Sequence, residues 1–202
     1  MPNTTDNFDI PFLDGTELVR DYPTFSEDLA NAVAAGLTAA GNAGIGSNVV
    51  QAVKTNQFTS TDSAFTDIPG LEVTITPSSA TAKILLIAQV HVSNTAGGRG
   101  AHIRFSGGNS SVYVADADGN RARAVSGLGQ ANSNVFDSTR LMYPGNGVYL
   151  DSPNTTSAVT YKIQVGQGNP SGTMTVNRQG NRADDDRDPN GASSLTAIEV
   201  KA

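Results

Sequence analysis

Apolar and polar residues alternate with a period of two along most of the chain after residue 49, a pattern that predicts β-strands. Leu71, Val73 and Ile75 alternate with polar residues, between Pro69-Gly70 and Pro77. The segment 83–92 has one wholly apolar face, formed by Ile84, Leu86, Ala88, Val90 and Val92. Its other face begins with Leu85 and Ile87 and ends with Gln89 and His91. A strand that is apolar on both faces is typical of a sandwich centre or a subunit interface.

Further strands are expected along the rest of the chain, at 101–105, 112–115, 122–125, 133–143, 158–165, 172–178 and 194–201. Turn-forming clusters separate them, including PGNG at 144–147 and DSPNTT at 151–156. The strand at 101–105 is expected to pair with 83–92 as a hairpin. Eight or nine strands without a helical period between them predict a mainly β fold, an antiparallel β-sandwich of the jelly-roll kind.

A helix is predicted just before the β region. Thr24 and Glu27 have the spacing of a capping box, which begins a helix. The apolar and small residues that follow recur at helical spacing and form one stripe: Leu29, Ala32, Val33, Gly36 and Leu37. A helix of about a dozen residues is marginal by itself. We therefore expect Leu29, Val33 and Leu37 to pack against the body or against other copies of the chain.

The residues that precede this helix form an apolar extended segment, made of Ile10, Pro11, Phe12 and Leu13. Apolar residues on an unpaired segment are a liability for a free monomer, so we expect these residues and Leu18 to lie in a groove of another subunit. A Gly- and Asn-rich stretch, GNAGIGSN, follows at 41–48. The predicted organisation is an arm with a short helix at 1–40, a linker at 41–48 and a β-sandwich at 49–202.

Composition narrows the range of partners and of chemistry. Only 16% of the 202 residues are charged, and the net charge is -6 without any basic run, which argues against nucleic acid or an anionic membrane as partner. Cysteine is absent, which excludes disulfides, thiolate nucleophiles and Cys-based metal sites. The N-terminal residues lack the pattern of a signal peptide, and no apolar run approaches the length of a membrane span. We expect the chain to fold in a reducing cytoplasm.

Two segments of the chain carry a family resemblance. IPFLDGTELVRDYPTFSEDLA at 10–30 and SSLTAIEV at 193–200 resemble the N-terminal arm and the last strand of tailed-bacteriophage fibre and minor tail proteins. The β domains of such proteins are similar to the trimeric jelly rolls of the TNF and C1q kind. The resemblance implies a virion location, an arm bound to another virion protein, and a homotrimer. It also implies that Leu195, Ile198 and Val200 of the last strand lie near the threefold axis.

Candidate catalytic residues are few, so we expect neither enzymatic activity nor a cofactor. A Ser-His-Asp triad requires a histidine, and the chain has only His91 and His102. If 93–100 closes a hairpin, these two lie side by side on one face, either as a metal pair, as a pH-sensitive trimer contact, or as ordinary surface histidines. Most Asp residues stand in turns and only four Glu are present, which leaves little room for the paired carboxylates of a glycosidase.

An acidic loop near the C-terminus provides a candidate metal site. Asp186, Asp188 and Asn190 match the opening of an EF-hand loop, but Ala197 stands where the bidentate Glu belongs. Asp116, Asp118 and Asn120 form a second, weaker copy. Acidic hairpin turns explain the same residues, so we expect no metal, with calcium at Asp186, Asp188 and Asn190 as the alternative.

Three tyrosines are candidates for contact with a glycan of the host surface, because each is predicted at a strand end beside polar loops. They are Tyr113, Tyr143 and Tyr149, with Asn146 from the same region. Tyrosines at strand ends are equally common as packing residues. Both roles stay open at the level of the sequence.

Three functions are consistent with these features. The first is a short trimeric fibre or appendage of a tailed-phage virion, whose repeated weak contacts would hold a host cell through multivalency. The second is a head decoration, cement or head-fibre protein that stabilises the capsid. The third is a soluble lectin-like carbohydrate-binding module outside any virion.

Overall fold

The structure is a computed structural model that describes residues 3–4, 11–12, 27–36, 45–96, 100–128, 141–167, 172–180 and 188–200. The chain forms two compact units, Met1–Gly44 and Ile45–Ala202. The boundary between them falls inside the stretch predicted as a linker, because the first long strand begins at Ile45 rather than at residue 49. Residues 45–48 are therefore part of an edge strand.

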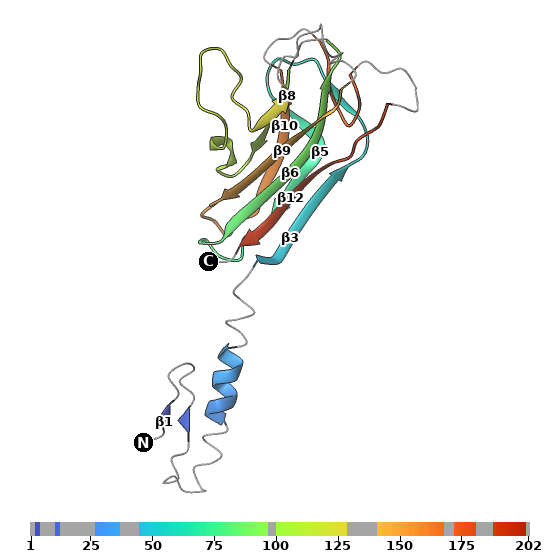
Figure 1. Ribbon diagram of the computed structural model, residues 1–202. Helices are drawn as coiled ribbons and strands as arrows, with labels where there is room; N and C mark the ends of the chain where they lie inside the picture. Colours follow the sequence, from blue (N-terminus) through green and yellow to red (C-terminus); the bar gives the residue numbers. More distant parts are fainter. Residues whose placement is uncertain are drawn as a thin grey trace. The chain divides into compact units, whose positions relative to one another are not determined.

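The first unit contains the predicted helix, which is confirmed over 27–36. Its side chains are exposed within the chain, with Leu29 at 42% and Val33 at 49%. Strands β1 (Asn3–Thr4) and β2 (Pro11–Phe12) form a short antiparallel ladder (Figure 1). The extended segment around Pro11 is thus paired with β1, not unpaired as expected. Thr24 and Leu37 lie outside the described residues.

The second unit is an antiparallel β-sandwich of two sheets (Figure 1). In the first sheet, β3 (Ile45–Lys54), β12 (Ser193–Val200), β6 (Lys83–Asn94) and β9 (Tyr143–Asp151) lie side by side. On the β12 side of β6, past the end of β12, β6 pairs with β11 (Met174–Val176), which pairs with β4 (Phe58–Ser60). The second sheet has the order β5 (Thr66–Ile75), β10 (Val159–Gly166), β7 (Ala101–Ser106) and β8 (Ser126–Leu128).

The connections between these strands are those of a jelly roll. Taken in chain order, β3, β5, β6 and β7 pair with β12, β10, β9 and β8 respectively, as in one long hairpin. Rolling this hairpin around a core adds the pairs β12–β6 and β10–β7, which complete the two sheets. The mainly β, jelly-roll-like sandwich expected from the sequence is confirmed.

The core lies between the two sheets and contains the wholly apolar face predicted for the segment 83–92. Ile84, Leu86, Val90 and Val92 of β6 are all 0% exposed. Leu71 and Ile75 of β5, together with Phe105 and Tyr161, complete the core from the second sheet. The period-two pattern therefore identified the inner face of the longest strand correctly.

The expected hairpin between 83–92 and 101–105 is wrong. β7 pairs with β10 and β8 in the second sheet, so the chain crosses between the sheets after β6. His91 and His102 consequently lie in different sheets and cannot be cross-strand neighbours. His91 Nδ1 lies 2.8 Å from the carbonyl oxygen of Ala192, whereas burial lowers the pKa of His102.

The turn predicted at 144–147 is instead part of β9. Two glycines allow β9 to pack against the opposite sheet, because both face the core where that sheet comes close. A Cβ on Gly145 would lie 3.0 Å from Ile103, and one on Gly147 would lie 2.8 Å from Phe105. The glycines here are required by packing between sheets, not by a reverse turn.

Two short strands predicted between β7 and β9 are also absent. Val112 ends a 3-10 turn, η2 (Ser110–Val112), and the residues after it up to Val125 form a loop. The neighbouring strand, β8, begins only at Ser126. Among the described residues no helix is long and apolar enough to cross a membrane.

Candidate interaction surface

The outer face of the first sheet is apolar over much of its area. We call this surface the apolar face. Its side chains come from four adjacent strands: Val49, Gln51, Val53, Leu85, Ile87, Gln89, Asn146, Val148, Leu150, Ser194, Thr196 and Ile198. Figure 1 shows the four strands that carry it, β3, β12, β6 and β9, as neighbours in one layer.

Strand register aligns the apolar residues into rows across the sheet. Val49 is opposite Ile198, Ile198 is opposite Leu85, and Leu85 is opposite Leu150. This row is apolar on all four strands. In the next row, Ile87 is opposite Val148. Directly opposed side chains touch across a sheet, so the rows make one continuous surface instead of scattered apolar residues.

The apolar face holds most of the markedly exposed large apolar side chains in the described part of the sandwich. Eight large apolar or aromatic side chains are markedly exposed in the described part of the chain, and five of them lie here: Val49 50%, Val53 58%, Ile87 40%, Val148 57% and Leu150 43%. Single exposed apolar residues are ordinary, whereas a contiguous exposed patch marks an interaction site. This face is the candidate functional site.

The apolar face also lacks charge. Every side chain named above as part of it is neutral, and Lys83 stands at its margin, opposite Val200. The chain as a whole carries a net charge of -6. The centres of protein interfaces are similarly depleted of charged residues.

The outer face of the second sheet has the opposite character, and we call it the polar face. Its side chains are Asp67, Glu72, Thr74, His102, Arg104, Thr160, Lys162 and Gln164. Lys162 Nζ lies 2.8 Å from Asp67 Oδ2, and Gln164 Nε2 donates to Asp67 Oδ1 at 2.7 Å. Hydrogen bonding from Lys162, and then from Gln164, holds the pKa of Asp67 below its usual value.

Arg104 extends this network on the polar face. Its Nε donates to Gln164 Oε1 at 2.8 Å, and its guanidinium stands 4.2 Å above the centre of the Phe65 ring. Thr74 and Thr160 share a hydrogen bond of 2.7 Å. The polar groups of this face are thus largely paired with each other.

The residues predicted at a trimer interface fall on different surfaces. Ile198 lies in the central row of the apolar face, but Leu195 is 0% exposed and belongs to the core. Leu195 is three positions before Ile198, and side chains of a strand alternate between faces. The prediction is therefore not supported for Leu195. Leu29 and Val33 are exposed on the helix, and Leu37 lies outside the described residues.

The predicted attachment residues belong to the first unit. Pro11 and Phe12 form β2, while Ile10, Leu13 and Leu18 lie outside the described residues. Their role in attachment to another virion protein stays a prediction.

The glycan candidates do not form one site. Tyr113 and Tyr149 stack with ring centres 4.9 Å apart, and burial, followed by the charge of Asp151, raises the pKa of Tyr149. Tyr143 begins β9, six residues before Tyr149 and therefore about 20 Å away along the strand. Asn146 lies on the opposite side of β9, on the apolar face. The structure brings together only Tyr113 and Tyr149.

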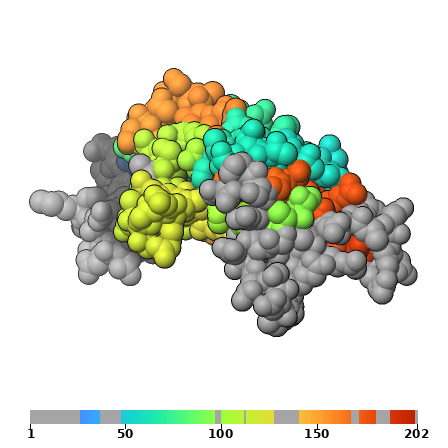
Figure 2. Space-filling view, turned by 90° about the horizontal axis from the view of Figure 1, so that it is seen from above, coloured from blue at the N-terminus to red at the C-terminus, as the bar shows by residue number. Residues whose placement is uncertain are grey.

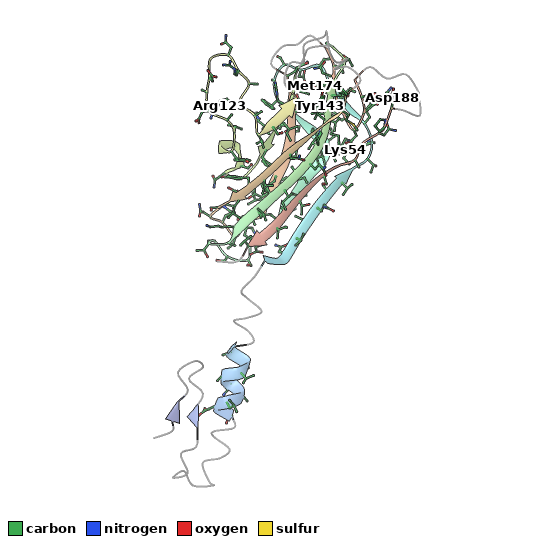
Figure 3. The ribbon with its side chains drawn as sticks, viewed as in Figure 1. Lys54, Arg123, Tyr143, Met174 and Asp188 are labelled. Carbon is green, nitrogen blue, oxygen red and sulfur yellow. The ribbon has the colours of Figure 1, made fainter. Side chains whose placement is uncertain are left out.

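The candidate calcium residues are only partly described. Asp188 and Asn190 are described and Asp186 is not. In the described ranges no group of three or more His, Cys, Asp or Glu side chains could hold a metal ion. Asp118 of the second acidic loop is paired with Arg121 at 2.6 Å. Figure 3 places Asp188 on the opposite side of the sandwich from Arg123, which follows Asp118 in its loop, so the two acidic loops cannot form one site.

A polar pocket that the sequence did not indicate lies between the edges of the two sheets. Its volume is about 390 Å³. The β4 residues Phe58, Thr59 and Ser60, the adjoining Thr61 and Asp62, and also Thr66 and Thr173 line it. The hydroxyl-rich run FTSTD at 58–62 was the available signal, but β4 itself was not predicted.

Of the comparisons with known proteins, the one with solved structures finds matches. No protein-family model and no curated protein sequence matches the chain. Among solved structures, the VP2 subviral particle of infectious bursal disease virus aligns with 76% of this chain and 32% of its own, at 16% identity and a TM-score of 0.34. Structures of the Gx and Gt strains of the same virus align at 16% identity, with TM-scores of 0.29 and 0.25. The chain spans about a third of the length of these structures, and values of this size assign it to no family.

Proposed function

We propose that the chain is a non-enzymatic structural component of a tailed-phage virion, a short homotrimeric fibre or appendage. The N-terminal arm would bind another virion protein, and the β-sandwich would be presented for adhesion to the host surface. The virion location rests on the resemblance of the segments 10–30 and 193–200 to phage fibre proteins. The assembly rests on the apolar face.

The apolar face is the observation that carries the proposal. A chain with a net charge of -6 repels its own copies wherever charged surfaces meet. Copies can associate at the least electrostatic cost through a neutral surface, and Val49, Ile198, Leu85 and Leu150 provide one that spans four strands. A second copy of the chain is therefore the occupant that fits this face best.

The resemblance to TNF-like and C1q-like jelly rolls supplies the number of copies, which is three. The last strand, β12, contributes Ile198 to the proposed interface, in keeping with a position near the threefold axis. At the proposed trimer interface, Leu85, Val148 and Leu150 replace Leu195, which was expected there from the sequence. The exposed Leu29 and Val33 of the helix would form a second contact among three arms.

Light scattering of the purified full chain tests this assembly. We expect a particle of three times the chain mass of 20.8 kDa. Leu85→Lys and Val148→Lys would each bring three like charges together at the interface, and should weaken association at least about a hundredfold, which corresponds to about 2.7 kcal/mol. Thr74→Lys places the same charge on the polar face and should leave the trimer intact. A stable monomer, or variants that all stay trimeric, would contradict the proposal.

Deletion of residues 1–40 tests the role of the arm. The remaining chain should fold and stay trimeric but no longer enter phage particles. Labelling of intact particles then locates the protein. Label on the tail supports an appendage, whereas label on the head would favour a decoration protein instead.

A further inference from the structure

The pocket between the edges of the two sheets has a lining of unusually uniform chemistry. Apart from Phe58, its described side chains carry hydroxyl groups or the carboxylate of Asp62, and no basic side chain of the described residues lines it. Its volume of about 390 Å³ falls in the range of about 300–1,000 Å³ that is typical of small-ligand sites. Figure 2 views this end of the sandwich from above, where the teal atoms of the region around residues 50–70 reach the surface.

Asp62 is held in place by its neighbours. Its Oδ2 accepts hydrogen bonds from Thr66 Oγ1 at 2.9 Å and from Ser60 Oγ at 3.2 Å. Its backbone N–H donates to Ser60 Oγ at 3.1 Å. None of the described residues donates a hydrogen bond to Oδ1. Two neighbouring hydroxyl groups thus bind one oxygen of an exposed carboxylate that belongs to the pocket lining.

The wall of the pocket is tied to a buried amide pair. Gln167 is 2% exposed and its Nε2 donates to the carbonyl oxygen of Thr61 at 3.1 Å. Asn94, which is 1% exposed, donates to Gln167 Oε1 at 2.9 Å. Support of this kind holds a binding site in one geometry before the ligand arrives. Phe58 packs against the core and offers the pocket an apolar surface.

We propose that this pocket binds a neutral saccharide. Hydroxyl groups both donate and accept, and they match a ligand that is itself rich in hydroxyl groups. Asp62 Oδ1 would accept charge-assisted hydrogen bonds from sugar hydroxyls, and Phe58 would contact the C–H side of the ring. An anionic ligand would meet the charge of Asp62, with no cation among the described lining residues to offset it.

A saccharide would be the ligand for the host adhesion proposed above. The role of the pocket in adhesion rests on that proposed function, whereas saccharide binding itself does not. No residue of the pocket belongs to the apolar face, so binding does not compete with the proposed trimer contact. One open pocket of this kind is expected to bind in the millimolar range, and three copies on one particle would act together through multivalency.

Saturation-transfer NMR on the full chain tests the inference with glucose, galactose, mannose, N-acetylglucosamine and lactose, each up to tens of millimolar. At least one of these sugars should receive saturation from the protein. Asp62→Ala should weaken its binding at least about tenfold because a charged acceptor is lost. Thr66→Val, which keeps the shape of the side chain, should weaken it severalfold. Thr74→Val and Asp118→Ala are the matched controls and should bind as the unmodified chain does.

The result that overturns the inference is absence of saturation for all five sugars, or binding that survives both Asp62→Ala and Thr66→Val. Circular dichroism checks that the variants fold, and Asp62→Asn replaces Asp62→Ala if the latter does not. Light scattering on the same samples separates the two proposals. A trimer that binds no sugar refutes the pocket alone, whereas a monomer that binds sugar refutes the assembly alone.

Discussion

The two outer faces of the sandwich come from strands with the same alternating pattern. They differ in whether their side chains find partners within the chain. On the polar face, Lys162, Asp67, Gln164 and Arg104 bond to one another. On the apolar face, Val148 and Val53 are more than half exposed and have no comparable partner in the described part of the chain. Water can hydrogen-bond to the side chains of the polar face but not to those of the apolar face. The difference indicates which side of the sandwich would be covered in the proposed assembly.

The contrast between the two faces also bears on how an acidic domain could assemble in the proposed way. Several charges of the sandwich lie on the polar face and in the loops, where Asp67 and Glu72 lie near Lys162 and Asp118 pairs with Arg121. Others are buried, at Lys54, Asp151 and Glu199. The apolar face keeps a charge only at its margin, with Lys83. In the proposed assembly, this separation would let copies meet through the apolar face while the charged surfaces stay in water.

The largest expected effect comes from Gly147, because the apolar face exists only if β9 joins the first sheet. Gly147→Val would place a Cβ 2.8 Å from Phe105 and 2.9 Å from Val125. Overpacking of this kind costs about 1–3 kcal/mol, which urea unfolding would measure as a lower midpoint. Asn146→Val, the adjacent outward-facing change, is the matched control and should alter stability by less than about 0.5 kcal/mol. Equal effects of the two changes would mean that the assigned facing of β9 is wrong.

A smaller effect is expected on the polar face, at Arg104. Arg104→Ala removes the hydrogen bond to Gln164 and the contact with the Phe65 ring. The expected loss is about 0.5–1.5 kcal/mol of unfolding free energy. The same substitution at Arg121, whose pair with Asp118 is highly exposed, should cost almost nothing. Light scattering should show unchanged association for both variants, and dissociation of Arg104→Ala would contradict the division between the faces.

The smallest effect concerns the acid stability of the polar face. Because the folded-state pKa of Asp67 is lowered from its ordinary 3.8, its contribution to stability is present above that value. The contribution is lost as the pH falls through the folded pKa. Asp67→Asn should therefore cost a few tenths of a kcal/mol at neutral pH, discounted for its exposure. Thermal unfolding from pH 7 down to pH 2 should show the two curves converging below about pH 4. A stability difference between the two proteins that widens in acid would mean that Asp67 does not pair with Lys162.

Much of the fold could be predicted from local pattern. The stripe that includes Leu29 and Val33 forms a helix at 27–36, and the alternation in 83–92 identifies the inner face of β6. The doubly apolar start of that segment, Leu85 and Ile87, was interpreted as the middle of a sandwich or a subunit interface. In the structure both residues lie on the apolar face. These features follow from periodicity within one segment, which the sequence displays directly.

The predictions that were wrong concerned which segments lie next to one another in the fold. PGNG has the composition of a turn, but Gly145 and Gly147 are small because Ile103 and Phe105 come from the opposite sheet. The nearness of 83–92 and 101–105 in the sequence suggested a hairpin, but a jelly roll sends these strands to different sheets. The pocket escaped prediction for the same reason, since Thr173 reaches it from a segment more than a hundred residues beyond β4. Contacts between the two sheets produce no periodic pattern within the sequence of either segment.

The sequence by itself determined the β-sandwich class, the separate N-terminal helix and the inward face of the longest strand, because each follows from burial of apolar residues at a fixed local spacing. Only the tertiary structure decided that Ile198, Leu85 and Leu150 make one surface while Leu195 lies in the core. It also gathered hydroxyl groups from three segments into one pocket. Such surfaces arise from strand register and sheet order, which bring together residues from distant parts of the chain.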